Sequence, residues 1–227
     1  MIKVKGADKS VRPHRPGHVV TSDMVRFATC FLALPLATAL WAQPPASSSS
    51  TPPSHAKSPF PEAGAISAGV YHNSTFGFSY KVPYGWVDRT ADMQDESADA
   101  SKSRLLLAVF ERPPEATGDT INSAVVIAAE ALPAGMKTAA EYFESLSALT
   151  TAKGFERKEE PGEFSVGSTK LVRGDFSKAR GTLAMYQASL VNLEKGYAIS
   201  FTFIGGSKDE VNELIEKLSF ASRKPAR

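Results

Sequence analysis

Two strand-length runs of almost unbroken apolar residues constrain the fold of this chain most strongly. They cover residues 104–111 (RLLLAVFE) and 123–130 (SAVVIAAE) and show little alternation of apolar and polar side chains. A strand with one face in water alternates, whereas a strand covered on both faces is apolar almost throughout. The two runs therefore predict central strands of a sheet that is packed on both sides.

Six further strands are expected around these runs. Two short strands joined by a turn precede them, and four strands follow as an antiparallel meander with turns that contain Gly, Lys or Asn. Their ranges are 71–73, 76–82, 163–167, 170–176, 182–191 and 197–204.

Two helices are predicted from their capping residues and their periodicity. Thr138 and Glu141 form a capping box, and Gly154 stands where a C-terminal glycine belongs. Ser207 and Glu210 predict a second capping box. The residues that follow it are spaced as i, i+3, i+4 and i+7, which predicts a helix with one apolar face: Val211, Leu214, Ile215 and Leu218.

The order of these elements predicts the fold class. Strands occur in runs with hairpin connections and do not alternate strictly with helices, which favours an α+β domain with an antiparallel sheet over a doubly wound dinucleotide-binding fold. We assign this domain to residues 69–222, near the commonest domain size. Residues 223–227 form a short C-terminal tail.

The N-terminal region has the features of an export signal. Met24-Val25-Arg26, the apolar residues 27–42 and then Gln43-Pro44-Pro45 follow the charged, hydrophobic and cleavable order of a signal peptide. The apolar stretch has 16 residues, whereas a membrane-spanning helix usually needs about 20. We therefore expect residues 1–42 to be a leader with a Sec-type signal peptide, cleaved after Ala42. Retention as an anchor stays open, as does a start at Met1 or at Met24.

A Pro/Ser-rich segment separates this leader from the domain. Residues 43–68 contain six prolines and seven serines, a composition that predicts a disordered linker. The one cysteine, Cys30, lies in the leader. Removal of the leader would leave no disulfide and no thiol, and would place the domain in the periplasm or outside the cell.

The charge distribution argues against nucleic acid as a partner. The chain has 26 Lys+Arg and 24 Asp+Glu, and six of the basic residues but only two of the acidic ones lie in residues 1–42. The mildly acidic remainder lacks the basic surface that nucleic-acid binding needs. No integral membrane domain is expected after signal cleavage, and peripheral membrane association stays open.

No group of residues points to catalysis or metal binding. Of the four histidines only His72 lies in the domain, and no Gly-x-Ser-x-Gly motif is present. The sequence Gly205-Gly206-Ser207 predicts a helix N-cap rather than a phosphate site. One acidic cluster lacks the spacing of a calcium loop: Asp92, Asp95, Glu96 and Asp99. We predict no catalytic residue, no metal site and no cofactor.

One short segment has the residues of a binding site. Tyr84, Trp86 and Arg89 follow a strand within a turn bounded by Pro and Gly, and aromatic residues with arginine are common anchors of interfaces. The alternative is that Trp86 closes one end of the core. The adhesion tripeptide Arg173-Gly174-Asp175 is a weaker candidate, because it lies inside a predicted strand.

Two parts of the sequence resemble the PsbP-like family. Residues 76–86, FGFSYKVPYGW, look like the family's opening signature, an aromatic-Gly-aromatic strand that leads into a Pro-x-Gly-Trp turn. The aromatic strand at 197–204 and the Ser207-capped helix that ends in Leu218-Ser219-Phe220 resemble its C-terminus. The resemblance implies an α/β/α sandwich whose central antiparallel sheet is flanked by helices and serves binding. The family's photosystem II subunit is a non-catalytic partner of a larger complex, and no site residue carries over to this chain.

Together these observations favour an exported, non-enzymatic binding or accessory domain that contacts a protein complex of the cell envelope. Two alternatives stay open. A small-molecule or lipid carrier would have an apolar cavity between sheet and helix. An envelope hydrolase that uses carboxylates would have a cleft with a carboxylate pair.

Overall fold

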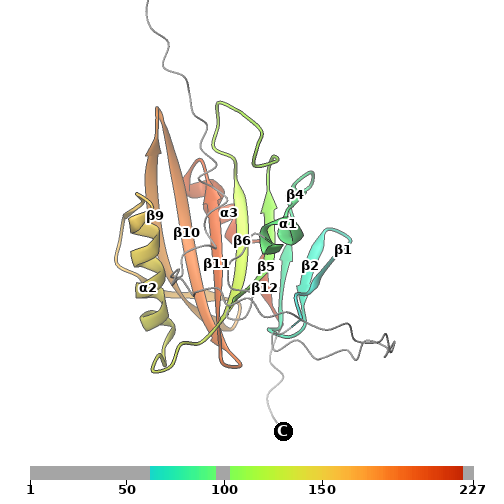
Figure 1. The fold of residues 1–227 in the computed structure, drawn as a ribbon, viewed down its shortest axis with the longest axis vertical. Coiled ribbons are helices and arrows are strands. Elements are labelled where there is room, and N and C mark those ends of the chain that lie inside the picture. The colour runs from blue at the N-terminus through green and yellow to red at the C-terminus, as the bar shows by residue number, and fades with distance from the viewer. Residues whose placement is uncertain (1–61, 96–102, 222–227) are drawn as a thin grey trace, which may run out of the picture.

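The structure is a computed structural model that describes residues 62–95 and 103–221. Two antiparallel sheets and three helices make up this part of the protein (Figure 1). The larger sheet has the strand order β4-β5-β6-β11-β10-β9-β7, and β8 also pairs with β9; the smaller sheet has the order β1-β2-β3-β12. The larger sheet contains β4 (Val87–Asp88), β5 (Ser103–Phe110), β6 (Ala124–Ala131), β7 (Glu156–Arg157), β8 (Gly162–Val166), β9 (Thr169–Arg180), β10 (Leu183–Glu194) and β11 (Tyr197–Gly205). The smaller sheet contains β1 (Ala65–Ser67), β2 (Val70–Asn73), β3 (Phe78–Lys81) and β12 (Leu218–Phe220). The predicted α+β class with an antiparallel sheet is confirmed.

The two apolar runs occupy interior positions of the larger sheet, as predicted. β5 pairs with β4 and β6, and β6 pairs with β5 and β11. Side chains of each strand enter hydrophobic clusters on both faces: Leu107 and Val109 of β5 lie in one cluster, and Leu105 and Ala108 lie in the other. A strand buried on both sides has no solvated face on which to place polar residues.

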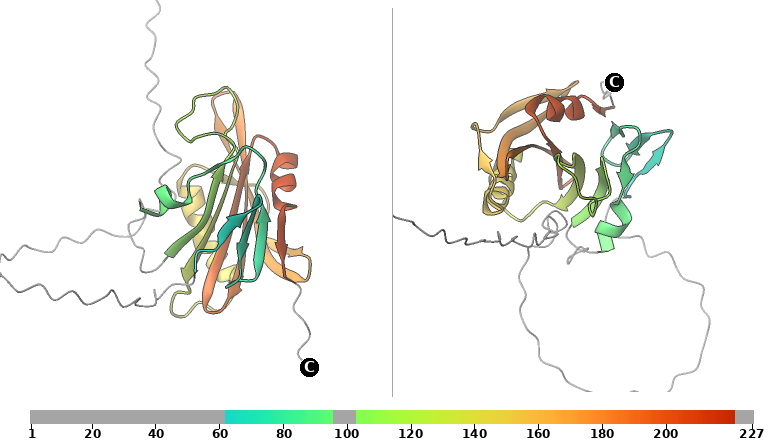
Figure 2. Two further views of the ribbon diagram at one scale, coloured as in Figure 1. Left: turned by 90° about the vertical axis from the view of Figure 1, so that its right-hand side faces the viewer. Right: turned by 90° about the horizontal axis from the view of Figure 1, so that it is seen from above.

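The larger sheet is covered by different layers on its two faces, as Figure 2 shows from above. The helix α2 (Ala139–Ala152) packs on one face over β9 and β10. The helix α3 (Lys208–Ile215) and the smaller sheet cover the other face. That second layer is therefore part helix and part sheet, which differs from the layer of helices alone that a sandwich implies.

The predicted capping residues begin both long helices. Thr138 forms the capping box of α2 with Glu141, and Gly154 follows the end of this helix with a φ of +84°. The Ser207 side chain accepts from the Glu210 backbone N–H at the start of α3. However, α3 ends at Ile215, earlier than the apolar spacing predicts. Leu218 belongs to β12, because this segment completes the ladder with β3 and still buries its side chain.

The structure contains one strand that the sequence analysis did not predict at the N-terminal side of the domain, β1. β1 lies within residues 43–68, the range expected to be linker. It pairs with β2, and the Tyr71 hydroxyl donates to the carbonyl of Ala63. All three residues of β1 are exposed, so hydrogen bonds and not apolar burial hold this strand. The composition of residues 43–68 therefore does not indicate a strand.

The six-residue helix α1 (Thr90–Asp95) was not predicted either. It lies beside β5, where β4 pairs with only two residues of that strand. Thr90 Oγ1 accepts from the N–H of Ala108 at 2.9 Å, and Gln94 Oε1 accepts from the N–H of Leu105 at 2.8 Å. Two side chains thus take the place of a strand at this edge of the sheet.

Several predictions fall on residues that are not described. These are the leader, the cleavage site after Ala42, most of the linker, the tail at 223–227, and two members of the acidic cluster, Glu96 and Asp99. Within residues 62–95 and 103–221, no helix is long and apolar enough to cross a membrane.

Candidate functional site

Tyr84 stands at the tip of a tight turn between β3 and β4 and is fully exposed. The Trp86 N–H donates to the Pro83 carbonyl at 3.3 Å, and Gly85 has a φ of +82°. A positive φ at the third position of such a turn strongly favours glycine. The local sequence therefore fixes a turn that presents the Tyr84 ring to solvent.

Trp86 lies two residues after Tyr84 in the chain and has a different environment. Its side chain is half-buried and packs against the hydrophobic cluster between the two sheets. This packing is compatible with the alternative role for Trp86, closure of one end of the core, which stays a prediction. Trp86 anchors the turn to the body of the domain.

Arg89 forms ion pairs with acidic residues of two segments, the helix α1 and the loop between β5 and β6. Its Nε lies 2.8 Å from Asp92 Oδ2, its Nη1 lies 2.8 Å from Glu115 Oε1, and its side chain is 25% exposed. The hydrogen bond that it donates to Glu115 is the main cause that raises the pKa of Arg89 above its ordinary value. Because Glu115 belongs to the long loop between β5 and β6, this pair ties that loop to the start of α1.

The loop at residues 111–123 is further ordered by its own side chains. Asn122 Oδ1 accepts from the Arg112 N–H at 3.0 Å, and Asn122 Nδ2 donates to the Arg112 carbonyl at 3.0 Å. Arg112 Nη1 in turn donates to Thr120 Oγ1 at 2.8 Å. The Asn122 side chain thus satisfies both backbone groups of Arg112 and holds the base of the loop closed.

Strand pairing brings the turn and the loop together. Val87 lies opposite Phe110 in the β4–β5 ladder, so Trp86 comes next to the beginning of the loop. We call the residues Tyr84, Trp86, Arg89 and Glu115 the Tyr84 surface. Of these, sequence reasoning missed Glu115, because a pair formed across 26 positions of the chain leaves no local signal.

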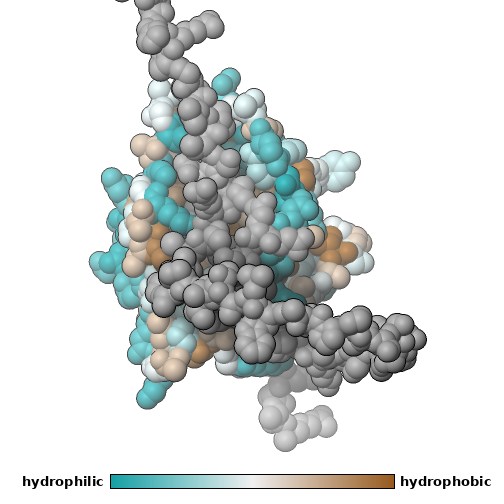
Figure 3. Space-filling view, in the orientation of Figure 1, coloured by the Kyte–Doolittle hydropathy of each residue, from teal (hydrophilic) through white to brown (hydrophobic). Residues whose placement is uncertain are grey.

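The other exposed large apolar side chains are scattered over the described surface. Leu149 lies on α2 and Ile66 on β1. On the face shown in Figure 3, hydrophobic residues form small separate patches over α2 and near β1 among hydrophilic surface. Tyr84 therefore differs from Leu149 and Ile66 in being fully exposed and in belonging to a turn that is fixed at both ends.

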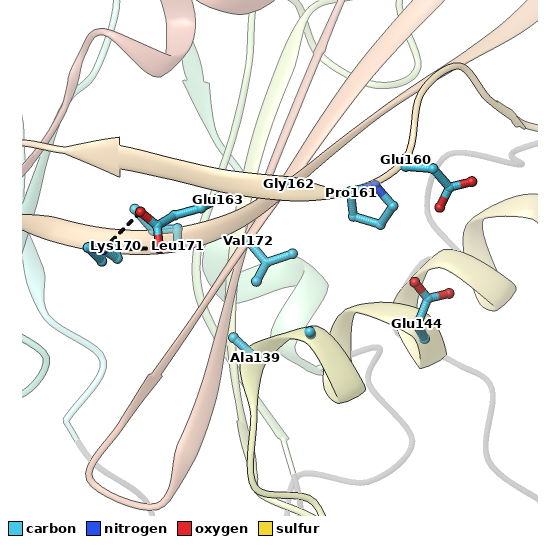
Figure 4. Close-up of a pocket in the computed structure, with 10 residues that line it drawn as sticks. Ala139, Glu144, Glu160, Pro161, Gly162, Glu163, Lys170, Leu171 and Val172 are labelled. Atoms are coloured by element: carbon cyan, nitrogen blue, oxygen red, sulfur yellow. Dashed lines mark hydrogen bonds and ion pairs between the residues drawn. The ribbon is translucent and has the colours of Figure 1, made fainter.

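A second candidate is an open groove of about 460 Å³ between α2 and the β8–β9 hairpin (Figure 4). Small and apolar residues form its middle, among them Ala139, Pro161 and Val172. Glu144 and Glu160 lie at one end and the ion pair of Glu163 with Lys170 lies at the other. We call this the α2–β8 groove.

The carboxylates of this groove bear on the hydrolase alternative. Arg157 Nη1 lies 3.3 Å from Glu144 Oε2, and Arg157 Nη2 lies 3.8 Å from Glu160 Oε2. One guanidinium thus contacts both carboxylates. Glycoside hydrolysis needs two carboxyl groups that flank a cleft, whereas these two lie together at one end of the groove. The carboxylates of this groove therefore give the hydrolase alternative no support.

The remaining sequence candidates have structural roles. His72 is exposed on β2 opposite Ser79. The N–H of Gly206, which an anion would need, already donates to Glu210 Oε2 at 2.8 Å. In a complete capping box this carboxylate would accept from the N–H of Ser207, so only the Ser207 half of the predicted second capping box is present. The described residues contain no group of three or more potential metal ligands.

The adhesion tripeptide lies inside β9, as predicted. Arg173 Nη2 contacts Asp175 Oδ1 at 2.8 Å, and the Arg173 guanidinium lies over the Phe164 ring at 5.0 Å. The two charged groups therefore bind each other on one strand and are not presented at a loop tip.

Comparison with known proteins gave similarity at the level of structure alone. No family model and no curated protein matches the chain. PsbP of the cyanobacterium Synechocystis has a TM-score of 0.46 at 13% identity, and the match covers 72% of this chain and 99% of that one. LpqN of Mycobacterium tuberculosis, involved in cell envelope biogenesis, has a TM-score of 0.38 at 14% identity, with 64% of this chain and 83% of that one covered.

A protein of unknown function from Pseudomonas aeruginosa has a TM-score of 0.35 at 12% identity, with 49% of this chain and 80% of that one covered. A PsbP is thus among the similar solved structures. The TM-scores and identities are low, so any function must be argued from this chain's own residues.

Proposed function

We propose that this protein is an exported, non-enzymatic binding domain of the cell envelope that contacts a partner protein through the Tyr84 surface. The observation that carries the proposal is the fully exposed Tyr84 ring on a turn that is anchored by Trp86 and lies beside an ordered loop.

An exposed tyrosine in a fixed position suits protein recognition for two reasons. Its ring offers a large apolar surface while its hydroxyl can still donate a hydrogen bond, which is why tyrosine is enriched at interfaces. A rigid anchor also loses little conformational entropy on binding. The Gly85 turn, the Trp86 contact and the Arg89–Glu115 pair supply that rigidity here.

The proposed compartment rests on the leader that the sequence predicts. The Sec-type signal predicted in residues 1–42 would deliver the domain to the periplasm or the outside. A complex of the envelope is then the partner within reach.

Site-specific photo-crosslinking in the native cells tests this proposal. A photoreactive phenylalanine analogue replaces Tyr84 in one variant and Leu149 in a second, which serves as control because Leu149 is also exposed but lies on α2. We expect one partner protein to be crosslinked from position 84 and not from position 149. The same products from both positions, or none from position 84, would contradict the proposal.

A different measurement, native mass spectrometry, tests the carrier alternative. The α2–β8 groove lies between helix and sheet, where a carrier would hold its ligand, but its two ends are charged, which disfavours a lipid. A small molecule that remains bound in the native mass spectrum, together with no crosslinked partner at position 84, would favour the carrier over the binding domain.

A further inference from the structure

The short helix α1 lies along the edge of a strand that is apolar on both faces. All residues from Leu105 to Phe110 of β5 are buried, and this segment contains no charged residue, no proline and no glycine. Such a segment pairs readily with other strands when its edge is open, so proteins cover the edge or interrupt it. Because β4 pairs with only Val109 and Phe110, the rest of this edge needs another cover.

Residues 87–94 provide that cover (Figure 1), and we call them the guard segment. Directly after β4, the Arg89 N–H donates to the Ala108 carbonyl at 2.8 Å. The N–H of Ala108 donates in turn to Thr90 Oγ1 at 2.9 Å. A side-chain oxygen thus replaces a backbone carbonyl at the point where the strand ends and the helix begins.

One turn further along α1, Gln94 closes the next position of the edge. Its Oε1 accepts from the Leu105 N–H at 2.8 Å. Thr90 and Gln94 are four residues apart and therefore lie on the same side of the helix. The two N–H groups that they bind are three residues apart in β5, because the ladder with β6 shifts register between Leu105 and Leu107. A regular antiparallel strand would offer partners at every second residue and does not match this spacing.

We propose that this edge of β5 is a latent interface for a second copy of the chain, and that the guard segment keeps it closed. Two copies related by a two-fold axis would pair β5 with β5 in antiparallel orientation, with Leu105 of each opposite Ala108 of the other. The irregular spacing of one copy then meets the same spacing of the other. Both strands are also apolar on both faces. A second copy therefore fits this edge by symmetry, independently of a partner at the Tyr84 surface.

Few contacts hold the guard segment on β5. The helix α1 has six residues, fewer than a helix needs to be stable by itself, so its position depends on what it touches. Its buried side chain is Met93, which packs in the same hydrophobic cluster as Leu105. β4 adds pairs with two residues of β5. The segment can therefore open while the ladder of β5 with β6 stays intact, and a second copy can then take its place.

Amide hydrogen exchange in two matched double variants tests the cover. Thr90→Val with Gln94→Ala removes both side-chain acceptors, whereas Thr90→Ser with Gln94→Glu keeps an oxygen at each position and is the control. In dilute protein, exchange at Leu105 and Ala108 should be about tenfold faster in the first variant and unchanged in the control, because a lost hydrogen bond changes an opening equilibrium by about this factor. Unchanged exchange at Ile127 in β6 shows that the sheet is still folded. Unchanged exchange at Leu105 and Ala108 in the first variant would overturn the proposal.

Sedimentation velocity over rising protein concentration tests the interface in the same variants. We expect the variant without acceptors to form dimers in which the Leu105 and Ala108 amides are protected again, while the control stays monomeric. A variant that stays monomeric at every concentration would overturn the proposal. So would dimers in which these two amides remain unprotected, or equal association of the variant and the control. If the double variant unfolds, the single change Gln94→Ala, which frees one amide, is measured in the same way.

Discussion

The ring of Phe143 in α2 lies directly against the backbone of Gly174 in β9. Phe143 is completely buried, and a Cβ added at Gly174 would overlap two atoms of its ring. The absence of a side chain at position 174 therefore lets α2 approach the larger sheet. This contact sets the position of α2 over β9 and, with it, one wall of the α2–β8 groove.

Gly174→Ala is expected to destabilise the domain by about 1–3 kcal/mol, the usual cost of an overpacked core. Chemical denaturation measures it. Gly162→Ala is the matched control, because an added Cβ there meets nothing within 4 Å and Gly162 has no positive φ. Gly174→Ala combined with Phe143→Leu should cost less than the sum of the two single changes. Equal stability of the Gly174→Ala and Gly162→Ala variants would contradict the packing argument.

Tyr84→Ala and Trp86→Ala should affect stability very differently although the residues are two positions apart. Tyr84 is fully exposed, so its loss should change the free energy of unfolding by less than about 0.5 kcal/mol. Trp86 packs against the core, and its loss should cost roughly 1–3 kcal/mol. Thermal unfolding of both variants checks this. A Tyr84→Ala variant as unstable as Trp86→Ala would show that the Tyr84 ring holds the fold.

The elements that sequence reasoning found are those whose signal is local. Burial of β5 and β6 on both faces shows in the strands themselves, and the caps of α2 and α3 depend on residues three positions apart. The positive φ of Gly154 follows from its place at a helix end. These features can be predicted from the sequence because the residues that cause each of them are close together in the chain.

The strand β12, which it missed, depends on a distant partner. β12 exists because β3 offers it a ladder 140 residues away, where Ser79 Oγ and Ser219 Oγ lie 2.8 Å apart. Leu218 fits a helical period and a buried strand position equally well. At the candidate site, the turn around Tyr84 could be predicted, but the pairing of Arg89 with Glu115 required the fold.

Tyr80 and Tyr142 allow the effect of a buried hydroxyl on stability to be compared with and without a hydrogen-bond partner. The Tyr80 hydroxyl is buried and has no hydrogen-bond partner among the described residues, whereas the Tyr142 hydroxyl donates to Glu130 Oε2 at 2.7 Å. Removal of an unpaired buried polar group is favourable and removal of a paired one is not. Tyr80→Phe should therefore raise the free energy of unfolding by about 1 kcal/mol, and Tyr142→Phe should lower it by about 1 kcal/mol or more. Urea denaturation of both variants measures the difference. A loss of stability in Tyr80→Phe would indicate that its hydroxyl has a partner.

Alkaline pH is expected to unfold the protein through its buried tyrosines. Burial raises the pKa of Tyr71 from 10.0 to about 12, and burial also raises the pKa values of Tyr80 and Tyr142. Below pH 10 these side chains are protonated in both states and do not make stability depend on pH. Between pH 10 and 12 the unfolded chain loses the Tyr71 proton while the folded chain keeps it, so the free energy of unfolding falls as pH rises.

The slope for one tyrosine is about 1.4 kcal/mol per pH unit, so Tyr71 alone accounts for roughly 3 kcal/mol across its window. Urea denaturation from pH 8 to pH 11 in wild type and in Tyr71→Phe checks this. The variant lacks the bonds of this hydroxyl to Ala63 and Asn73 and should be less stable at pH 8. Its decline above pH 10 should be shallower, because Tyr71 no longer titrates, and parallel declines in the two proteins would exclude Tyr71 as a cause.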